Sequence, residues 1–185
     1  MGMGQVFSEN GKLTPVTYVK CEPSVVCGIK TAEKDEYDAV VLGFENLGTR
    51  ATKTRKFRVV KEFKGDVSSV EIGSPVDVSL FSEGEKVTMI GVSKGKGFQG
   101  RVRRHGMHVA RKSHGTKYIR HGSTGSIGIT ARVQKGIRMP GRMGCDQVTL
   151  HKREIIKVDA TRNFVAIKGP VPGAINSVVF LKKSA

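Results

Sequence analysis

The chain has 185 residues, a formal net charge of +16 and a hydrophobic fraction of 38%, which predicts one domain with a modest core and at most a large insertion. No apolar run approaches the roughly 18–20 residues that span a bilayer, and the N-terminal sequence lacks the layout of a signal peptide. Strong basicity indicates a polyanionic partner, expected to be nucleic acid rather than membrane. The three cysteines lack CxxC spacing and are expected to be reduced thiols, as in a cytosolic protein.

The N-terminal part of the chain predicts short β-strands at 14–20, 25–29 and 37–44. These β-branched and aromatic segments are separated by Gly, Pro, Asn and charged clusters, a pattern typical of a small sheet or barrel. Residues 49–65 are basic, and their apolar members could form one helical stripe. Two interpretations stay open for this segment: a surface helix packed on the sheet, which is favoured, or a second RNA-contacting element.

Further strands are expected at 67–72, 76–81 and 86–92, separated by turn-forming Gly, Ser and Pro. Strand patterning then stops and resumes near residue 147. Segments 147–158 and 164–168 predict a hairpin, and 177–182 predicts a last strand. Many short strands with few helical patterns favour a mainly β fold, a small closed β-barrel.

The interruption in strand patterning coincides with a basic block, residues 86–145. This block contains fourteen Lys and Arg, four of the five His and twelve Gly, but no Asp or Glu. Because the whole chain has 32 Lys and Arg against 16 Asp and Glu, 18 basic and 16 acidic residues lie elsewhere. Nearly all of the net charge is therefore concentrated in one Gly-rich block.

The basic block lacks the apolar residues needed for a core of its own. Ordering about fifty residues costs on the order of 50–100 kcal/mol of backbone entropy, and the apolar residues of the block are scattered singles without sustained period. We therefore expect residues 93–144, the extension, to be an irregular insertion between two neighbouring strands, ordered by an RNA partner. Residues 1–92 and 145–185 would form one discontinuous globular domain.

Two motifs in the block suggest other chemistry. Gly95-Lys96-Gly97-Phe98-Gln99-Gly100 matches GxGxxG, but no acidic residue follows about 20 positions later and no βαβ unit is predicted. The histidines with Cys145 are irregularly spaced for zinc. No cofactor, metal or small-molecule substrate is expected, and Ser113-His114 lacks a nearby carboxylate for nucleophilic catalysis.

The polar and basic residues of the extension are the candidate RNA contacts, mostly to phosphates. They are Lys94, Lys96, Gln99, Arg101, Arg103, Arg104, His105, His108, Arg111, Lys112, His114, Lys117, Arg120, His121, Ser126, Arg132, Lys135, Arg138 and Arg142.

Three stretches of the extension carry a family resemblance: SKGKGFQGRVRRHGMH (93–108), SHGTKYIRHGSTGSIG (113–128) and KGIRMPGRMG (135–144). They closely resemble the signature of bacterial-type ribosomal protein L-three, the universal third protein of the large subunit. The flanking sequences MGQVFSENGKLTPVT, KTAEKDEYDAVVLGF and VDATRNFVAIKGPVPGAINSVVF look like their family counterparts too. The resemblance covers essentially the full length.

The resemblance implies a structural constituent of the large ribosomal subunit, in the cytoplasm, with no catalytic residues. Its globular part would be a small β-barrel similar to the second domain of translation factors. Its extension would thread into large-subunit ribosomal RNA towards the peptidyl transferase centre, among neighbouring ribosomal proteins, and would support early assembly. Segments 93–104 and 113–120 would line the extension, 125–128 would lead to its tip, and 136–144 would lead back.

The sequence departs from the family pattern at the tip of the extension. Many bacterial members have a methylatable Gln after GSIG, where this chain has Ile129, and residues 129–134 make a shorter tip.

Two other function classes stay open from the residues alone. A free RNA-modifying or RNA-cleaving enzyme would use the His cluster, although the absence of acids argues against it. An architectural DNA-binding protein would need a groove-reading helix that is not evident.

Overall fold

The computed structural model describes residues 2–7, 10–65, 67, 70–109, 111, 113–115, 122–125 and 132–184. The chain divides into two compact units. The first comprises Met1–Met89, Thr149–Val171 and Phe180–Ala185, and the second comprises Ile90–Val148 and Pro172–Val179. The fold is mainly β, as the sequence predicts.

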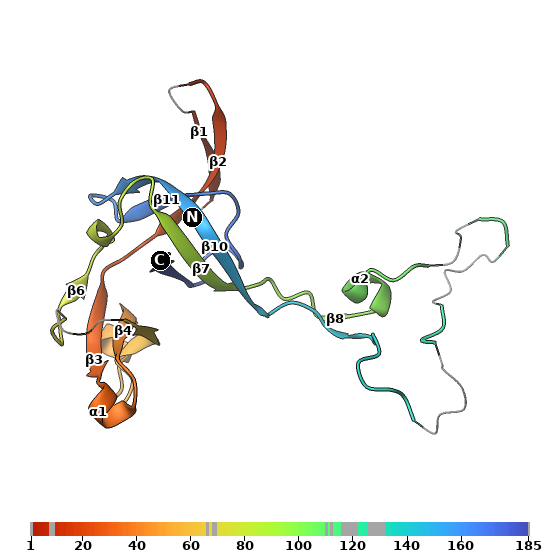
Figure 1. Ribbon diagram of the computed structural model, residues 1–185, viewed down its shortest axis with the longest axis horizontal. Coiled ribbons are helices and arrows are strands. Elements are labelled where there is room, and N and C mark those ends of the chain that lie inside the picture. The colour runs from red at the N-terminus through yellow and green to blue at the C-terminus, as the bar shows by residue number, and fades with distance from the viewer. Residues whose placement is uncertain are drawn as a thin grey trace. The chain divides into compact units, whose positions relative to one another are not determined.

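The larger sheet has six strands in the order β1-β2-β11-β10-β7-β12 (Figure 1). Their bounds are β1 Met3–Phe7, β2 Leu13–Lys20, β11 Phe164–Lys168, β10 Gln147–Asp159, β7 Lys86–Val92 and β12 Val179–Lys183. The hairpins β1–β2 and β10–β11 are antiparallel. Strands β7 and β10 are neighbours, so the chain leaves the sheet and returns to it on adjacent strands.

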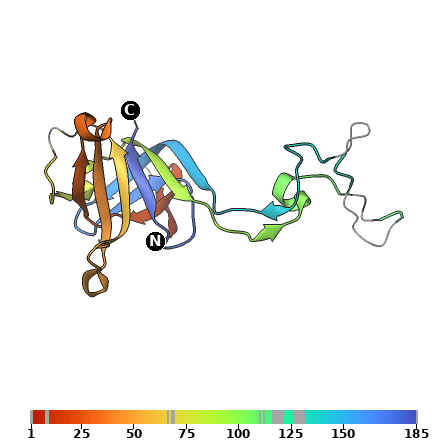
Figure 2. The same ribbon diagram turned by 90° about the horizontal axis from the view of Figure 1, so that it is seen from below.

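The smaller sheet has four strands in the order β5-β4-β3-β6 (Figure 2). Their bounds are β5 Phe57–Lys64, β4 Ala39–Asn46, β3 Ser24–Lys30 and β6 Pro75–Val76. A single helical turn, α1 (Ala32–Asp35), joins β3 to β4. Two 3₁₀ turns, η1 (Gly48–Arg50) and η2 (Val78–Leu80), follow β4 and β6.

The buried apolar residues of the core come from both sheets and, at Val78, from η2. They are Val16, Val26, Ala39, Val78, Val87, Met89, Ile155, Val165, Ala166 and Ile167, all at most 3% exposed. At one edge of each sheet, the Phe63 ring of β5 meets the Phe180 ring of β12 at a centroid distance of 6.2 Å. Hydrogen-bonded pairing between β5 and β12 is not found in the described part of the chain, so closure of these two sheets into a barrel is not confirmed.

The structure confirms the strands predicted near 14–20, 25–29, 86–92, 147–158 and 164–168 and corrects three other predictions. The helix expected within 49–65 is wrong, because the segment pairs along β4 as β5. Its residues 57, 59, 61 and 63 share one face of that strand, so its apolar spacing also satisfies a period of two. No strand is present in the described part of 67–72, and 76–81 is mostly the η2 turn, which buries Val78. Strand β1 and helix α1 were not anticipated.

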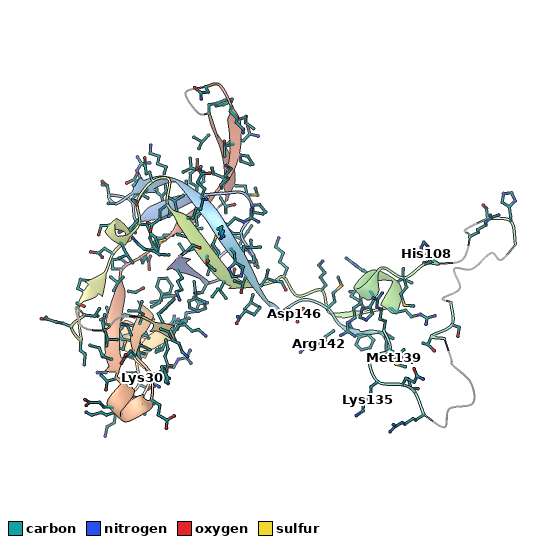
Figure 3. The ribbon with its side chains drawn as sticks, viewed as in Figure 1. Lys30, His108, Lys135, Met139, Arg142 and Asp146 are labelled. Carbon is teal, nitrogen blue, oxygen red and sulfur yellow. The ribbon has the colours of Figure 1, made fainter. Side chains whose placement is uncertain are left out.

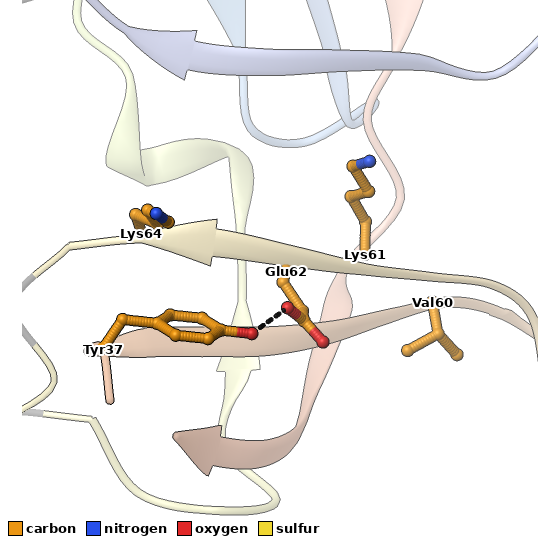
Figure 4. Close-up of a pocket in the computed structure, with 5 residues that line it drawn as sticks. All are labelled: Tyr37, Val60, Lys61, Glu62 and Lys64. Carbon is orange, nitrogen blue, oxygen red and sulfur yellow. Dashed lines mark hydrogen bonds between the residues drawn. The ribbon is translucent and has the colours of Figure 1, made fainter. Parts of the chain in front are cut away.

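A polar cluster of Lys30, Tyr37 and Glu62 links three segments of the smaller sheet, and Figure 4 shows its Tyr37–Glu62 hydrogen bond. Lys30 Nζ donates to the Tyr37 hydroxyl at 2.9 Å, and that hydroxyl donates to Glu62 Oε2 at 2.9 Å. Lys30 also pairs with Glu62 Oε1 at 3.3 Å. The Tyr37 hydrogen bond, followed by that of Lys30, holds the pKa of Glu62 below its ordinary value. Tyr37 and Glu62 also line an open hollow, together with Val60, Lys61 and Lys64.

Acid should weaken this cluster. A carboxylate with a lowered folded-state pKa contributes stability that is present above the unfolded pKa and is lost as pH falls through the folded value. The Glu62→Gln variant should therefore lower the unfolding free energy near pH 7, and its deficit should shrink as pH falls below about 4. Denaturant unfolding of both proteins from pH 7 to pH 3 measures this difference. Glu71→Gln, an exposed glutamate outside the ion pairs of the described residues, is the control. A pH-independent deficit would contradict the ionic origin.

Candidate nucleic-acid interface

The extension begins as a two-stranded ladder formed by residues 93–99 and 141–146. Ser93 N donates to the Asp146 carbonyl at 2.9 Å, and Cys145 N donates to the Ser93 carbonyl at 3.2 Å. Further along, Lys96 N donates to the Met143 carbonyl at 2.9 Å, and Met143 N donates to the Gly97 carbonyl at 3.0 Å. Strands β8 (Phe98–Gln99) and β9 (Gly141–Arg142) then pair antiparallel (Figure 2). Backbone hydrogen bonds therefore order this part of the extension without an apolar core.

The close approach of the two ladder strands at position 144 requires glycine. Its φ of +79° lies in the left-handed region, and a Cβ at this position would overlap the Lys94 carbonyl oxygen of the opposite strand. A side chain here would meet backbone, which cannot swing aside as a flexible side chain can. The two strands approach this closely only because residue 144 lacks a Cβ.

A short helix, α2 (Arg101–His105), follows the ladder and is bound to the returning strand. Arg104 Nη1 donates to the Met139 carbonyl at 3.1 Å, and His105 Nε2 lies 3.1 Å from the same oxygen. Gly106, in the left-handed region at φ +65°, ends the helix. Figure 3 shows Met139 and Arg142 near α2, on the segment that leads back to the ladder. Arg104 and His105 thus join the outgoing and returning strands.

The cations of the extension are largely free of internal ion pairs. Lys94, Lys96, Arg138 and Arg142 are exposed. The six ion pairs found among the described residues all have their cation outside the basic block. They join Lys20–Glu22, Lys30–Asp35, Lys30–Glu62, Arg58–Glu45, Lys168–Glu154 and Lys183–Glu85. The charge of the extension is therefore available to a polyanion.

The structure places fourteen of the predicted RNA contacts, in two groups, and the other five lie outside the described residues. Lys94, Lys96, Gln99, Arg101, Arg103, Arg104, His105, Arg138 and Arg142 lie on the ladder, α2 or the segment that returns to them. His108, Arg111, His114, Arg132 and Lys135 are exposed and lie farther along the extension. Lys112, Lys117, Arg120, His121 and Ser126 lie outside the described residues, as does Ile129 at the expected tip.

Some predicted contacts also have bonds within the extension. The Gln99 amide nitrogen donates to the Lys96 carbonyl, and Arg103 Nη1 lies 3.5 Å from Gln99 Oε1. Together with Arg104 and His105, these side chains form hydrogen bonds within the extension in addition to being candidate RNA contacts. The sequence predicts all four only as RNA contacts. The bonds of Arg104 and His105 to the Met139 carbonyl join residues 35 and 34 positions apart, so no local pattern indicates them.

Phe98 is a candidate contact that sequence reasoning left among the scattered apolar residues. Its side chain is 74% exposed, and it pairs across the ladder with Arg142. Its neighbour Gly97 has no side chain, and a Cβ built there would meet no atom within 4 Å. An exposed aromatic ring beside cations is a stacking platform for an unpaired base. A phenylalanine inside an otherwise cationic, Gly-rich run was the signal in the sequence.

The GxGxxG segment is built differently from a dinucleotide site. Its Phe98 and Gln99 form β8, which pairs antiparallel with β9, whereas a dinucleotide-binding fold needs parallel strands.

Burial raises the pKa of the Cys21 thiol to about 11, so it is protonated at neutral pH and is a poor nucleophile. Within the described residues, no group of three or more His, Cys, Asp and Glu side chains is arranged to hold a metal ion.

A sheet domain that carries an acid-free, exposed cationic extension is typical of proteins that are built into ribonucleoprotein particles. Comparison with known proteins gives the family. The family model for ribosomal protein L3 matches residues 53–163, and the chain belongs to the ribosomal protein L3 family. No helix among the described residues is long and apolar enough to cross a membrane.

The curated relatives agree over the whole length. The chain is 44% identical to the large ribosomal subunit protein uL3 of Geobacillus thermodenitrificans, over 100% of this chain and 93% of the relative. It is 44% and 43% identical to the proteins of the same name from Bacillus thuringiensis and Bacillus cytotoxicus, over 98% of this chain and 92% of each relative. The family resemblance found in the sequence is therefore confirmed. The family comprises structural ribosomal proteins, which argues against the alternative of a free RNA-processing enzyme.

Substitution of Gly144 should disrupt the ladder. Gly144→Ala combines left-handed strain, about 1–2 kcal/mol for an L-residue, with overlap against the Lys94 carbonyl. Hydrogen exchange of the Lys96 and Met143 amides should accelerate in this variant, because both amides donate ladder bonds.

The Gly136→Ala variant is a control that introduces left-handed backbone strain without steric overlap between a Cβ and the opposite strand. Gly136 has φ +83°, but a Cβ there would meet no atom within 4 Å. This control should leave the exchange of the two ladder amides unchanged. Equal acceleration in both variants would show that the close approach at Gly144 is not what orders the ladder.

Proposed function

We propose that this chain is a structural constituent of the large ribosomal subunit that binds large-subunit ribosomal RNA through its extension. The observation that carries this function is the set of exposed cations, outside the ion pairs of the described residues, on an extension whose sequence contains no Asp or Glu. Family membership agrees with it.

The binding mechanism is charge neutralisation at fixed positions. Each Lys or Arg that contacts a phosphate releases condensed counterions, which makes the affinity dependent on salt. The ladder and the bonds of Arg104 and His105 to the Met139 carbonyl order residues 93–105 and 139–146 before RNA binds. Pre-ordering lowers the entropy that binding must remove from this part of the chain. The protein thereby braces RNA segments and performs no chemical step.

The finer features of the family complete the proposal. Residues 1–92 and 145–185 form a barrel-like globular domain on the subunit surface, and residues 93–144 enter the RNA towards the peptidyl transferase centre. The protein contacts neighbouring ribosomal proteins, supports early assembly of the large subunit and resides on ribosomes in the cytoplasm. The adjacency of β7 and β10 supports this division, because the extension then departs from one place in the sheet.

Removal of the free extension cations should reduce the salt dependence of RNA binding. A variant with Lys94, Lys96, Arg138 and Arg142 changed to Ala should lose about 3–4 from the slope of log affinity against log salt if each contacts a phosphate of duplex RNA. Filter binding of large-subunit ribosomal RNA between about 50 and 200 mM salt measures that slope.

Sedimentation of cell extracts with and without ribonuclease should show the unaltered chain leaving large-subunit fractions after RNA digestion.

The matched control changes Lys20, Arg58, Lys168 and Lys183 to Ala. Each of these four forms an ion pair in the sheets, so the control removes the same charge from paired positions. Its slope should stay near that of the unaltered chain. The proposed function fails if the two variants behave alike, or if the protein sediments free of large subunits.

Phe98 should contribute through its aromatic face. Phe98→Leu should weaken RNA binding by about 1–3 kcal/mol, the usual value of a base–aromatic stack, whereas Phe98→Tyr should retain it. The same two changes at Phe7, which is 69% exposed on β1, serve as the control and should leave binding unchanged. Full binding by Phe98→Leu would show that Phe98 contributes apolar contact only.

A further inference from the structure

The hairpin between β4 and β5 carries a second group of cations, in the first compact unit. Its connecting segment, residues 47–56, is called here the basic tip. It contains Arg50, Lys53, Arg55 and Lys56, all exposed. No acidic residue occurs between Glu45 and Glu62. The tip is therefore a small acid-free region within the part of the chain whose charges otherwise nearly balance.

The basic tip has a defined backbone. Leu47 N donates to the Lys56 carbonyl at 2.9 Å, which continues the β4–β5 ladder to the start of the tip. Thr52 and Arg55 exchange backbone hydrogen bonds at 3.0 and 3.2 Å, which closes a turn. Gly48 N donates to Asn46 Oδ1 at 3.0 Å. The four cations are thus presented on an ordered hairpin end.

The cations of β5 itself have partners, whereas those of the tip are left for an external anion. Arg58 Nη1 donates to both Glu45 carboxylate oxygens, at 2.8 and 3.2 Å. Lys61 lies over the Phe180 ring and Lys64 over the Tyr37 ring. In the tip, Arg55 Nη2 donates to the Arg58 carbonyl at 3.2 Å, which orients its guanidinium without neutralising it. None of the ion pairs of the described chain includes a tip cation.

We propose that the basic tip is a second RNA-binding surface, separate from the extension, which contacts phosphates of the sugar-phosphate backbone. This inference rests on the proposed function, because it takes the polyanion to be RNA. The tip has four cations but no exposed large apolar side chain, so it lacks the groups that insert into a lipid surface. Its Thr, Gly and Ala residues provide no ring for base stacking, so contact with it positions RNA without reading its sequence.

The test changes Arg50, Lys53, Arg55 and Lys56 to Gln in the full-length chain. Binding of large-subunit ribosomal RNA is measured as a function of salt, beside the variant lacking Lys94, Lys96, Arg138 and Arg142. For duplex-like contact, the slope of log affinity against log salt concentration should be smaller in magnitude by about 3–4 in the tip variant than in the unaltered chain. When the two variants are combined, the reductions in slope should add. The charge-matched control at Lys20, Arg58, Lys168 and Lys183 should keep its slope.

The outcomes separate this inference from the proposed function. If the tip variant binds like the control while the extension variant is weakened, the inference is overturned and the proposed function stands. If only the tip variant is weakened, the tip surface stands and binding through the extension is overturned. Tip-dependent binding to anionic phospholipid vesicles, without loss of RNA binding, also overturns the inference.

A conservative variant guards against a folding artefact. Arg50→Lys with Arg55→Lys keeps all four charges and should retain the salt slope of the unaltered chain. The same loss of slope in this variant as in the Gln variant would point to disruption of the hairpin and would overturn a role for the tip charges. Thermal unfolding of each variant confirms that the sheets are retained.

Discussion

The extension depends on backbone hydrogen bonding between two strands that have no core to hold them. Apolar burial orders the two sheets, where residues such as Met89 and Ile155 are fully enclosed. The ladder replaces that burial with amide–carbonyl bonds from Ser93 to Gln99, and glycine at position 144 lets the strands approach. The result is a pair of strands that is ordered by backbone hydrogen bonds and not by apolar packing. The charged residues of the extension can therefore all be cations.

Segregation of charge follows from the same arrangement. Acidic residues in the sheets are used locally: Glu45 binds Arg58, Glu154 binds Lys168, and Glu85 binds Lys183. Exposed ion pairs of this kind contribute little to stability, but they cancel charge where RNA contact is not needed. The absence of acids from residues 86–145 has the opposite effect, because no carboxylate within that stretch can neutralise its cations. Local pairing and its absence thus divide the surface into neutral and RNA-attracting regions.

Much of the fold and the main site could be predicted from the sequence, because each left a strong local pattern. The acid-free block, the hairpin of β10 and β11 and the resemblance of residues 93–144 needed no tertiary information. Residues 49–65 were misassigned, since Phe57, Val59 and Phe63 fit either period and only pairing with β4 decides between them. The bonds of Arg104 and His105 to Met139 join distant positions, so no local pattern could show them. Phe98 is indicated only weakly by the sequence, as a single aromatic residue within a polar, Gly-rich segment.

Strands β7 and β10 lie side by side in the sheet, and this has a consequence for the evolution of the chain. A segment that starts and ends on adjacent strands closes a loop whose entropic cost grows only slowly with length. Residues can therefore be gained or lost at its far end without a change of register in the sheet or the ladder. Length variation among members of the family should accordingly concentrate in the sequence between the two strands of the ladder, with the ladder itself kept constant.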